Sequence, residues 1–210
     1  MRYRPISPAA LTAELTDRIE AVTGRSRIAV AVDGAEGATD TTALANALVD
    51  PLRLRGRPTV RISARDFLRP ASLRFEHGRQ DPDARYTDWL DVNALRREVL
   101  DPLADGGRGE VLPALWDAGR DRATRRARVP VPEGGVVLVD GELLLGTGLA
   151  FDLVVHLWCS PAALRRRVPA GDAWALPAYA RYEEEVDPAA LADVVVRVDD
   201  PRHPAVYEGS

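Results

Sequence analysis

The most informative segment of this 210-residue chain is Arg27-Ile28-Ala29-Val30-Ala31-Val32-Asp33-Gly34-Ala35-Glu36-Gly37-Ala38-Thr39-Asp40-Thr41-Thr42, which Ala43-Leu44-Ala45-Asn46-Ala47-Leu48 follows. Small and β-branched apolar residues give way to a glycine-containing loop and then to an Ala/Leu-rich amphipathic segment. This pattern predicts a buried strand, a tight loop and a helix. The same order is typical of a phosphate-binding loop, in which backbone N–H groups and a helix N-terminus hold phosphate.

The loop departs from the usual phosphate-binding pattern, which is glycine, four residues, glycine, lysine and Ser or Thr. Counted from Gly34, Thr39 stands at the second glycine and Asp40 at the lysine, and only Thr41 fits. A carboxylate in place of an ammonium turns an attraction of roughly 4 kcal/mol at about 4 Å into a repulsion of similar size. The chain contains no lysine, so no displaced lysine can replace the missing one. The loop is therefore expected to oppose triphosphate binding.

Length and composition predict one globular domain. The chain is long enough for a full core, and 46% hydrophobic residues in regular runs argue against disorder. A formal net charge of −4 provides no general basic field, so nucleic acid is not expected as a partner. The single Cys159, an N-terminus unlike a signal peptide and the lack of a long apolar run predict a cytoplasmic protein with no membrane partner.

The remaining periodicity alternates helices with strands. Helices are expected at 7–22, 43–48, 92–103, 161–168 and 177–186, and strands at 27–32, 59–63, 136–142, 153–158 and 193–198, with a Pro-rich tail after the last strand. Residues 65–89 carry little periodicity and are expected to form a long surface loop, and 111–117 suits an edge or a strand end. Strands buried on both faces predict a three-layer α/β/α sandwich with a mostly parallel sheet.

Several segments together resemble the uridine kinase and phosphoribulokinase-like P-loop kinases. They are Val32-Asp33-Gly34 with Thr41-Thr42, residues 63–70, residues 86–91 with 94–97, Val137-Leu138-Val139-Asp140-Gly141, and residues 192–196. The resemblance implies a P-loop nucleoside-kinase-like fold over residues 1–210, with a degenerate phosphate loop at 33–42, an acceptor-side loop at 65–91 and a shortened lid at 165–176.

Two more parts of the kinase apparatus depart from the family pattern. In such kinases an Asp-x-Phe element supplies the base for the acceptor hydroxyl. Matching on Phe67 places Arg65 at the base position and leaves Asp66 one residue away, on the opposite side of a strand-like backbone. Because phosphoryl transfer depends on positioning and charge neutralisation, a changed clamp, base and lid together argue against ordinary kinase activity.

Five carboxylates are expected near the carboxyl ends of the parallel strands, where open α/β sheets bind ligands. As candidate catalytic acids or bases we name Asp40, Asp66, Asp140 and Glu142. The alternative is that Asp33 and Asp140 are inherited without a present task and that Asp40 caps the helix beginning near Thr41.

Candidate binding residues lie in the phosphate loop at 33–42, in the acceptor-side loop at 65–91 and in the lid at 165–176. For a cofactor they are Gly34, Gly37, Thr39, Thr41 and Thr42; for a substrate they are Asp33, Arg65, Phe67, His77, Tyr86, Asp88, Trp89, Arg165 and Arg166. The four tryptophans, Trp89, Trp116, Trp158 and Trp174, could line a pocket or pack in the core or lid, and His156 is expected in the core. The three histidines and one cysteine have no zinc-site spacing, so no metal site is assigned.

Three functions stay open. The first is a repurposed small-molecule enzyme that uses cleft carboxylates for acid–base chemistry, the second a pseudokinase-like binding or regulatory protein, and the third an atypical kinase acting on a nucleoside-like hydroxyl. The first is favoured slightly over the second, and both over the third. ATP and Mg²⁺ are expected only under the third, a small molecule is the expected partner, and a homodimer is left open.

Overall fold

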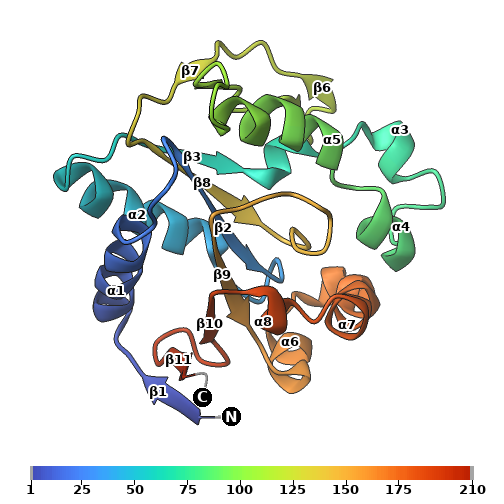
Figure 1. The fold of residues 1–210 in the computed structure, drawn as a ribbon. Coiled ribbons are helices and arrows are strands. Elements are labelled where there is room, and N and C mark those ends of the chain that lie inside the picture. The colour runs from blue at the N-terminus through green and yellow to red at the C-terminus, as the bar shows by residue number, and fades with distance from the viewer. Residues whose placement is uncertain (1, 209–210) are drawn as a thin grey trace.

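A seven-stranded sheet forms the centre of the molecule in the computed structural model, which describes residues 2–208 (Figure 1). From one edge to the other the strands are β1 (Arg2–Pro5), β11 (Ala205–Glu208), β10 (Val194–Arg197), β9 (Leu153–Trp158), β2 (Ile28–Gly34), β8 (Val136–Gly141) and β3 (Thr59–Ser63). The five strands from β10 to β3 are parallel, whereas β11 and β1 add antiparallel pairs. The sheet is therefore mostly parallel, as predicted.

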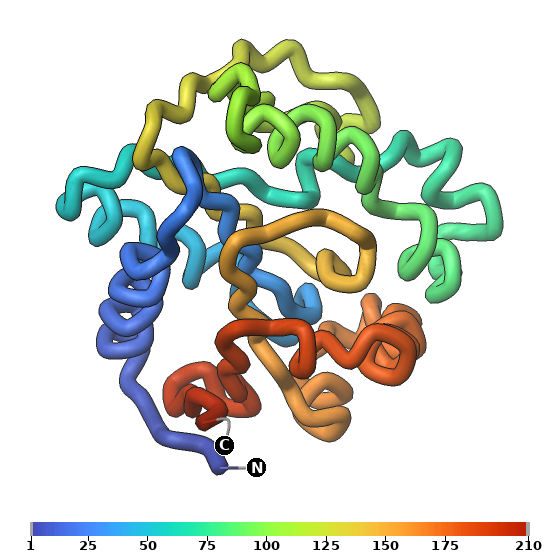
Figure 2. Tube along the Cα trace, in the orientation of Figure 1, coloured from blue at the N-terminus to red at the C-terminus, as the bar shows by residue number. Residues whose placement is uncertain are grey.

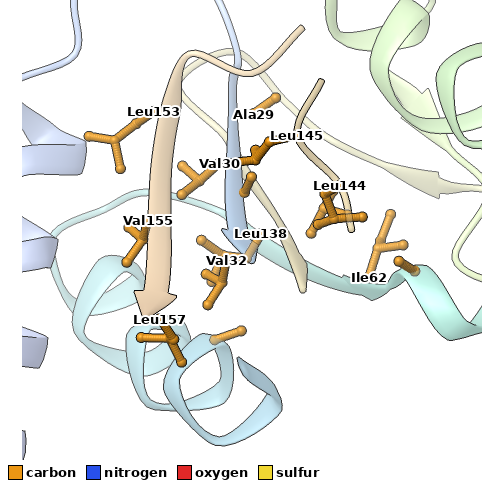
Figure 3. Close-up of a cluster of buried hydrophobic side chains, with 14 of the residues drawn as sticks. Ala29, Val30, Val32, Ile62, Leu138, Leu144, Leu145, Leu153, Val155 and Leu157 are labelled. Carbon is orange, nitrogen blue, oxygen red and sulfur yellow. The ribbon is translucent and has the colours of Figure 1, made fainter. Parts of the chain in front are cut away.

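Strand β2 lies in the interior of the sheet, and all seven of its residues are buried. It pairs with β8 on one side and β9 on the other, a position that suits a continuous apolar strand covered on both faces. The register sets Val32 opposite Asp140 and Asp33 opposite His156. Figure 3 shows the surrounding apolar core, to which the neighbouring strands β2, β8 and β9 contribute Val30, Val32, Leu138 and Val155.

Helices flank the sheet and complete the predicted three-layer α/β/α sandwich. On one side lie α1 (Pro8–Glu20) and α2 (Thr41–Leu54), and α5 (Val92–Leu95) and α7 (Leu176–Glu185) lie on the other (Figure 1). Helix α1 begins where Ser7 accepts a hydrogen bond from the Ala10 N–H, and its apolar stripe, Leu11, Leu15 and Ile19, is buried. Two short helices, α6 (Pro161–Arg167) and α8 (Pro188–Leu191), flank α7 in the sequence.

Residues 64–87 are more structured than the surface loop predicted for residues 65–89. They contain a 3₁₀ turn, η1 (Ala64–Phe67), and two short helices, α3 (Ala71–Arg74) and α4 (Pro82–Thr87). Phe67, Arg74, Ala84 and Arg85 are buried. Helices of four to six residues are shorter than the window over which a 3.6-residue period can be recognised, which is why the sequence pattern did not predict them.

Two further elements differ from the prediction. The Pro-rich tail contains β11, which pairs with the N-terminal β1 and sets Tyr3 opposite Tyr207, so the first and last strands lie side by side (Figure 2). The helix expected over 92–103 continues from α5 into a π-helical turn, η2 (Arg96–Leu100), and a 3₁₀ turn, η3 (Asp101–Leu103). Both differences come from pairing or backbone detail that periodicity does not encode.

The segment between η3 and β8 lies outside the main sheet. Its short strands form two separate ladders, β4 (Glu110–Val111) with β7 (Val129–Pro130) and β5 (Trp116–Asp117) with β6 (Arg122–Ala123). No helix within residues 2–208 combines the length and apolar character needed to cross a bilayer.

Candidate functional site

A cavity of about 650 Å³ lies at the carboxyl ends of β2, β8 and β3, the edge at which open α/β sheets bind ligands. Four segments contribute to its lining: the loop and helix start at 34–42, the acceptor-side segment at 63–92, the turn after β8 at 140–147, and residues 168–179. Ala118 and Gly119 also contribute to it. The predicted degenerate phosphate loop and acceptor-side loop therefore face a common space.

Three backbone N–H groups of the loop after β2 donate hydrogen bonds within the protein. The N–H groups of Ala38 and Thr39 both donate to the carbonyl oxygen of Ala35, at 3.2 and 2.9 Å, and the Glu36 N–H donates to Glu142 Oε2 at 3.4 Å. The Thr39 hydroxyl also donates to Ala35 O, at 3.0 Å, and its oxygen lies 2.6 Å from where a Cβ on Gly34 would stand. The side chain at the second-glycine position thus fills the loop, and three of its N–H groups already have acceptors.

Asp40 caps helix α2. Its Oδ1 accepts a hydrogen bond from the Ala43 N–H at 2.8 Å, and the residue is exposed at the mouth of the cavity. This is the capping geometry that favours Asp at a helix N-terminus. Asp40 thus makes the capping contact predicted as one of its two possible roles, at the position where the usual loop pattern has a lysine.

An arginine contacts both Asp140, at the end of β8, and Thr42, the residue after the Ser/Thr position of the loop pattern. Arg61, on β3, donates through Nε to Asp140 Oδ1 at 2.6 Å and through Nη2 to Oδ2 at 2.8 Å. The same Nη2 donates to Thr42 Oγ1 at 3.0 Å, and the Thr42 hydroxyl donates to Asp140 Oδ2 at 2.8 Å. The carboxylate of Asp140 is therefore neutralised by a guanidinium fork inside the protein.

A second arginine, Arg85, is buried and forms ion pairs in the lining of the cavity. Arg85, on α4, has a side chain only 7% exposed and donates through Nη2 to Glu142 and to the Tyr179 hydroxyl, at 3.0 and 3.2 Å. Glu36 lies 3.3 Å from the same nitrogen, and Tyr179 donates to Glu142 at 2.5 Å. Burial by itself lowers the pKa of Arg85, but the carboxylate of Glu142 and the Tyr179 hydroxyl outweigh it and raise that pKa. Glu142 is thus neutralised within the wall.

Two tryptophans extend this wall. The rings of Trp89 and Trp174 lie 5.6 Å apart, and the Arg85 guanidinium lies 4.9 Å from the first ring centre and 5.3 Å from the second. Arg74 lies 5.3 Å from the ring centre of Trp89, and the Trp89 indole N–H donates to the Arg74 carbonyl at 3.1 Å. Cation–π contacts of this kind help to hold a guanidinium away from water.

Behind the loop, a buried network holds Asp33. Its Oδ2 lies 2.8 Å from His156 Nδ1 and accepts from the Tyr182 hydroxyl at 3.0 Å, and Oδ1 accepts from the Leu144 N–H at 3.0 Å. Burial alone lowers the pKa of His156, but hydrogen bonds to Asp33 and Glu183 outweigh it and raise that pKa to about 9. This network lies in the core, so Asp33 is separated from the cavity.

The structure separates the named candidates into two groups. Those that line the cavity are Gly34, Gly37, Thr39, Asp40, Thr41, Thr42, Arg65, Tyr86, Trp89, Asp140 and Glu142. Those that lie elsewhere are Asp33, Asp66, Phe67, His77, Asp88, Arg165 and Arg166.

The candidates outside the cavity differ in burial. Phe67 is fully buried in the core, and His77, Arg165 and Arg166 are exposed. The carboxylate of Asp66 is half-buried, and this burial is the main cause of its raised pKa. Within the lid segment, Val168 and Trp174 line the cavity, whereas Arg165 and Arg166 do not.

Four residues of the site were not named as candidates: Arg61, Arg74, Arg85 and Tyr179. Arg61 carried a signal, because an arginine inside the apolar strand Val60-Arg61-Ile62 needs a buried partner. Arg74 and Arg85 stand next to aromatic residues in a segment without periodicity, and their burial depends on how α3 and α4 fold back onto the sheet.

Known structures share this architecture. A protein described as a possible uridine kinase from Bacillus stearothermophilus is 23% identical, with a TM-score of 0.71, over 88% of this chain and 96% of that one. A candidate fructose transport system kinase from Silicibacter sp. TM1040 is 22% identical, with a TM-score of 0.58, over 88% and 91%. The YGR205w protein is 10% identical, with a TM-score of 0.60, over 98% and 100%.

No protein-family model matches the sequence, and no curated protein matches it. The structural similarities are below one quarter identity, so they establish the fold alone. The chain has the P-loop kinase fold, as its motifs predicted.

Proposed function

We propose that this chain is a small-molecule-binding protein on the P-loop kinase fold that does not use Mg²⁺-ATP. The observation that carries the proposal is the Arg61 guanidinium, which contacts both Asp140 oxygens and Thr42 Oγ1 within 3.0 Å. A positive charge from the protein itself thus stands beside the Asp140 carboxylate, an oxygen ligand that a divalent cation at this edge of the sheet would need.

The residues present do not fit the cofactors of an ordinary kinase. A triphosphate needs free loop N–H groups and a lysine, but three N–H groups are engaged, Thr39 fills the loop and Asp40 adds a negative charge. Magnesium needs oxygen ligands with uncompensated charge, and Asp140 is already paired with Arg61. The loop half of the cleft therefore favours neither group.

The remaining part of the cleft suits a small ligand. Its volume of about 650 Å³ lies in the range of small-molecule sites, and its wall combines two tryptophans with a few fixed polar groups. Three of the four candidate catalytic carboxylates have other contacts, since Asp40 caps a helix, Asp140 pairs with Arg61, and Glu142 pairs with Arg85; the fourth, Asp66, does not line the cavity. We therefore place binding without turnover above acid–base catalysis, reversing the order that the sequence suggested.

A repurposed enzyme is the second candidate, and one contact favours it. The Tyr179 hydroxyl donates to Glu142 at 2.5 Å on the cavity wall, an arrangement through which a proton could be exchanged with a ligand. Burial is the main cause of the raised pKa of Tyr179, so the hydroxyl keeps its proton near neutral pH. Under this alternative Glu142→Gln abolishes turnover of the ligand, whereas under pure binding there is no turnover to lose.

The decisive experiment is a calorimetric titration of the full chain with ATP in the presence of Mg²⁺. We expect no binding at millimolar nucleotide by the natural protein. The matched control is Thr39→Gly/Asp40→Lys/Arg61→Ser, which restores the loop pattern and removes the internal cation; measurable binding by this variant would show that the changed residues are the cause. Micromolar binding by the natural protein would overturn the proposal and favour the atypical kinase.

A further inference from the structure

Arg74 is a buried arginine on the cavity wall with little local compensation for its charge. Its side chain is 5% exposed, and it lines the same cavity as Arg85 and Trp89. Its Nε donates to the carbonyl oxygen of Arg69 at 2.7 Å, and its guanidinium lies 4.7 Å from the ring centre of Phe75. These contacts fix the guanidinium without neutralising it.

The nearest carboxylate to Arg74 is already in use. Asp121 Oδ1 lies 4.0 Å from Arg74 Nη2, beyond hydrogen-bonding distance, and accepts from the Ala71 N–H at 2.7 Å and the Trp116 indole N–H at 3.1 Å. Within residues 2–208 the two Nη atoms of Arg74 make no hydrogen bond. Burial is the main cause of the lowered pKa of Arg74, whereas the pKa of Arg85, paired with Glu142, is raised.

A buried cation is costly unless an anion or enough hydrogen bonds compensate it. Arg85 meets this condition inside the protein, whereas the Nη atoms of Arg74 make no hydrogen bond within residues 2–208 and are open to the cavity that Arg74 lines. We infer that Arg74 binds an oxyanion, a carboxylate or a phosphate group, on the ligand of this cleft; the inference rests on the proposed binding function. The guanidinium fork matches either group in geometry, and the rest of the ligand would lie along Trp89.

The charges at the loop end of the cavity support placing the oxyanion of the ligand near Arg74. The loop end of the cavity carries the carboxylates of Asp40 and Asp172, which make no ion pair within residues 2–208 and repel an anion, whereas Glu36 is paired with Arg65 and Arg85. The oxyanion is thus held at the acceptor-side end, whereas a nucleotide in the usual kinase orientation would place its phosphates at the loop. The ligand class is a small organic anion with polar or weakly basic groups at the opposite end.

The test is a titration of the ¹⁵N-labelled full chain followed by NMR of the Arg74 Nε–H and Trp89 indole N–H. The probes are inorganic phosphate, glycolate and the neutral analogue glycolamide. We expect phosphate or glycolate to shift both signals and glycolamide to shift neither. A response to phosphate alone indicates a phosphate ester as ligand, and a response to glycolate alone indicates a carboxylic acid.

Two variants test the assignment to Arg74. We expect Arg74→Gln to weaken binding of the effective anion at least about tenfold. The control is Arg79→Gln, which removes another arginine stacked on Phe75, one that is exposed and does not line the cavity; its affinity should be unchanged. Equal losses in both variants would show only a general charge effect and would overturn the inference.

A third variant keeps the test independent of folding defects in Arg74→Gln. Asp121→Asn removes the opposing charge, yet the amide oxygen can still accept from Ala71 and Trp116. Asparagine also tolerates the positive φ of 48° at this position. We expect anion affinity to rise about three- to tenfold. If the folded variant shows no gain and no anion shifts the Arg74 signal, the subsite does not exist, although the absence of Mg²⁺-ATP binding would stand. Conversely, Mg²⁺-ATP binding alongside a responsive Arg74 would refute the proposed function alone.

Discussion

Replacing Arg61 by methionine tests whether a protein side chain has taken the place of a cation. Methionine keeps the apolar part of the side chain and removes the guanidinium that donates to Asp140 and Thr42. The Asp140 side chain is only 2% exposed, so the variant leaves a buried carboxylate with one hydroxyl donor, Thr42. We expect a large loss of stability for this reason.

The size of the loss follows from the burial of the pair. Removing one partner of a buried ion pair costs about 3–5 kcal/mol. Because 25% of the Arg61 side chain is exposed, solvent screens part of the charge and the lower end, about 3 kcal/mol, applies. For a chain of this length each kcal/mol corresponds to roughly 2–4 °C, so the melting temperature should fall by about 6–12 °C.

The assay is thermal unfolding of three proteins with and without Mg²⁺. Arg61→Met should melt lower than the natural protein, and Arg61→Met/Asp140→Asn should recover most of the difference because both charges are removed. Mg²⁺ at about five times its Kd should return about 1 kcal/mol to the single variant alone, since Asp140 and Thr42 then offer free oxygen ligands. Equal melting temperatures for Arg61→Met and the natural protein, or stabilisation of the natural protein by Mg²⁺, would refute the assigned role of Arg61.

Three further outcomes follow from the same contacts. The pKa of His156 is raised to about 9, so its ion pair with Asp33 stabilises the fold fully below about pH 6.5, and this contribution is lost as the pH rises through 9. In urea unfolding, the difference in free energy of unfolding between the natural protein and His156→Gln should shrink between these pH values. A constant difference would contradict the assignment. Phe67→Ala should cost about 3–5 kcal/mol in urea unfolding because the side chain is fully buried, and a loss below 1 kcal/mol would place Phe67 outside the core. Asp40→Ala should cost about 0.5–2 kcal/mol and Asp40→Asn far less, since asparagine also caps; equal thermal shifts would exclude capping as the role of Asp40.

The sequence by itself determined the architecture and the position of the cleft. The run from Ile28 to Val32 is apolar on both sides of the strand, a pattern typical of a strand inside a parallel sheet covered by helices. The loop and helix that follow it must then meet the carboxyl edge of the sheet. For this reason Asp40, Thr42, Asp140 and Glu142 could be placed around one cavity from their positions in the chain.

Only the tertiary structure decided which charges in that cleft remain free. The partners of Asp140 and Glu142 are Arg61 and Arg85, 79 and 57 residues away in the chain. Ion pairing depends on distances of a few ångströms between elements that are far apart in the chain. Sequence periodicity predicts local structure and does not predict these distances. The same holds for Arg74, whose burial and weak compensation arise where the short helices of the acceptor side fold back over the sheet.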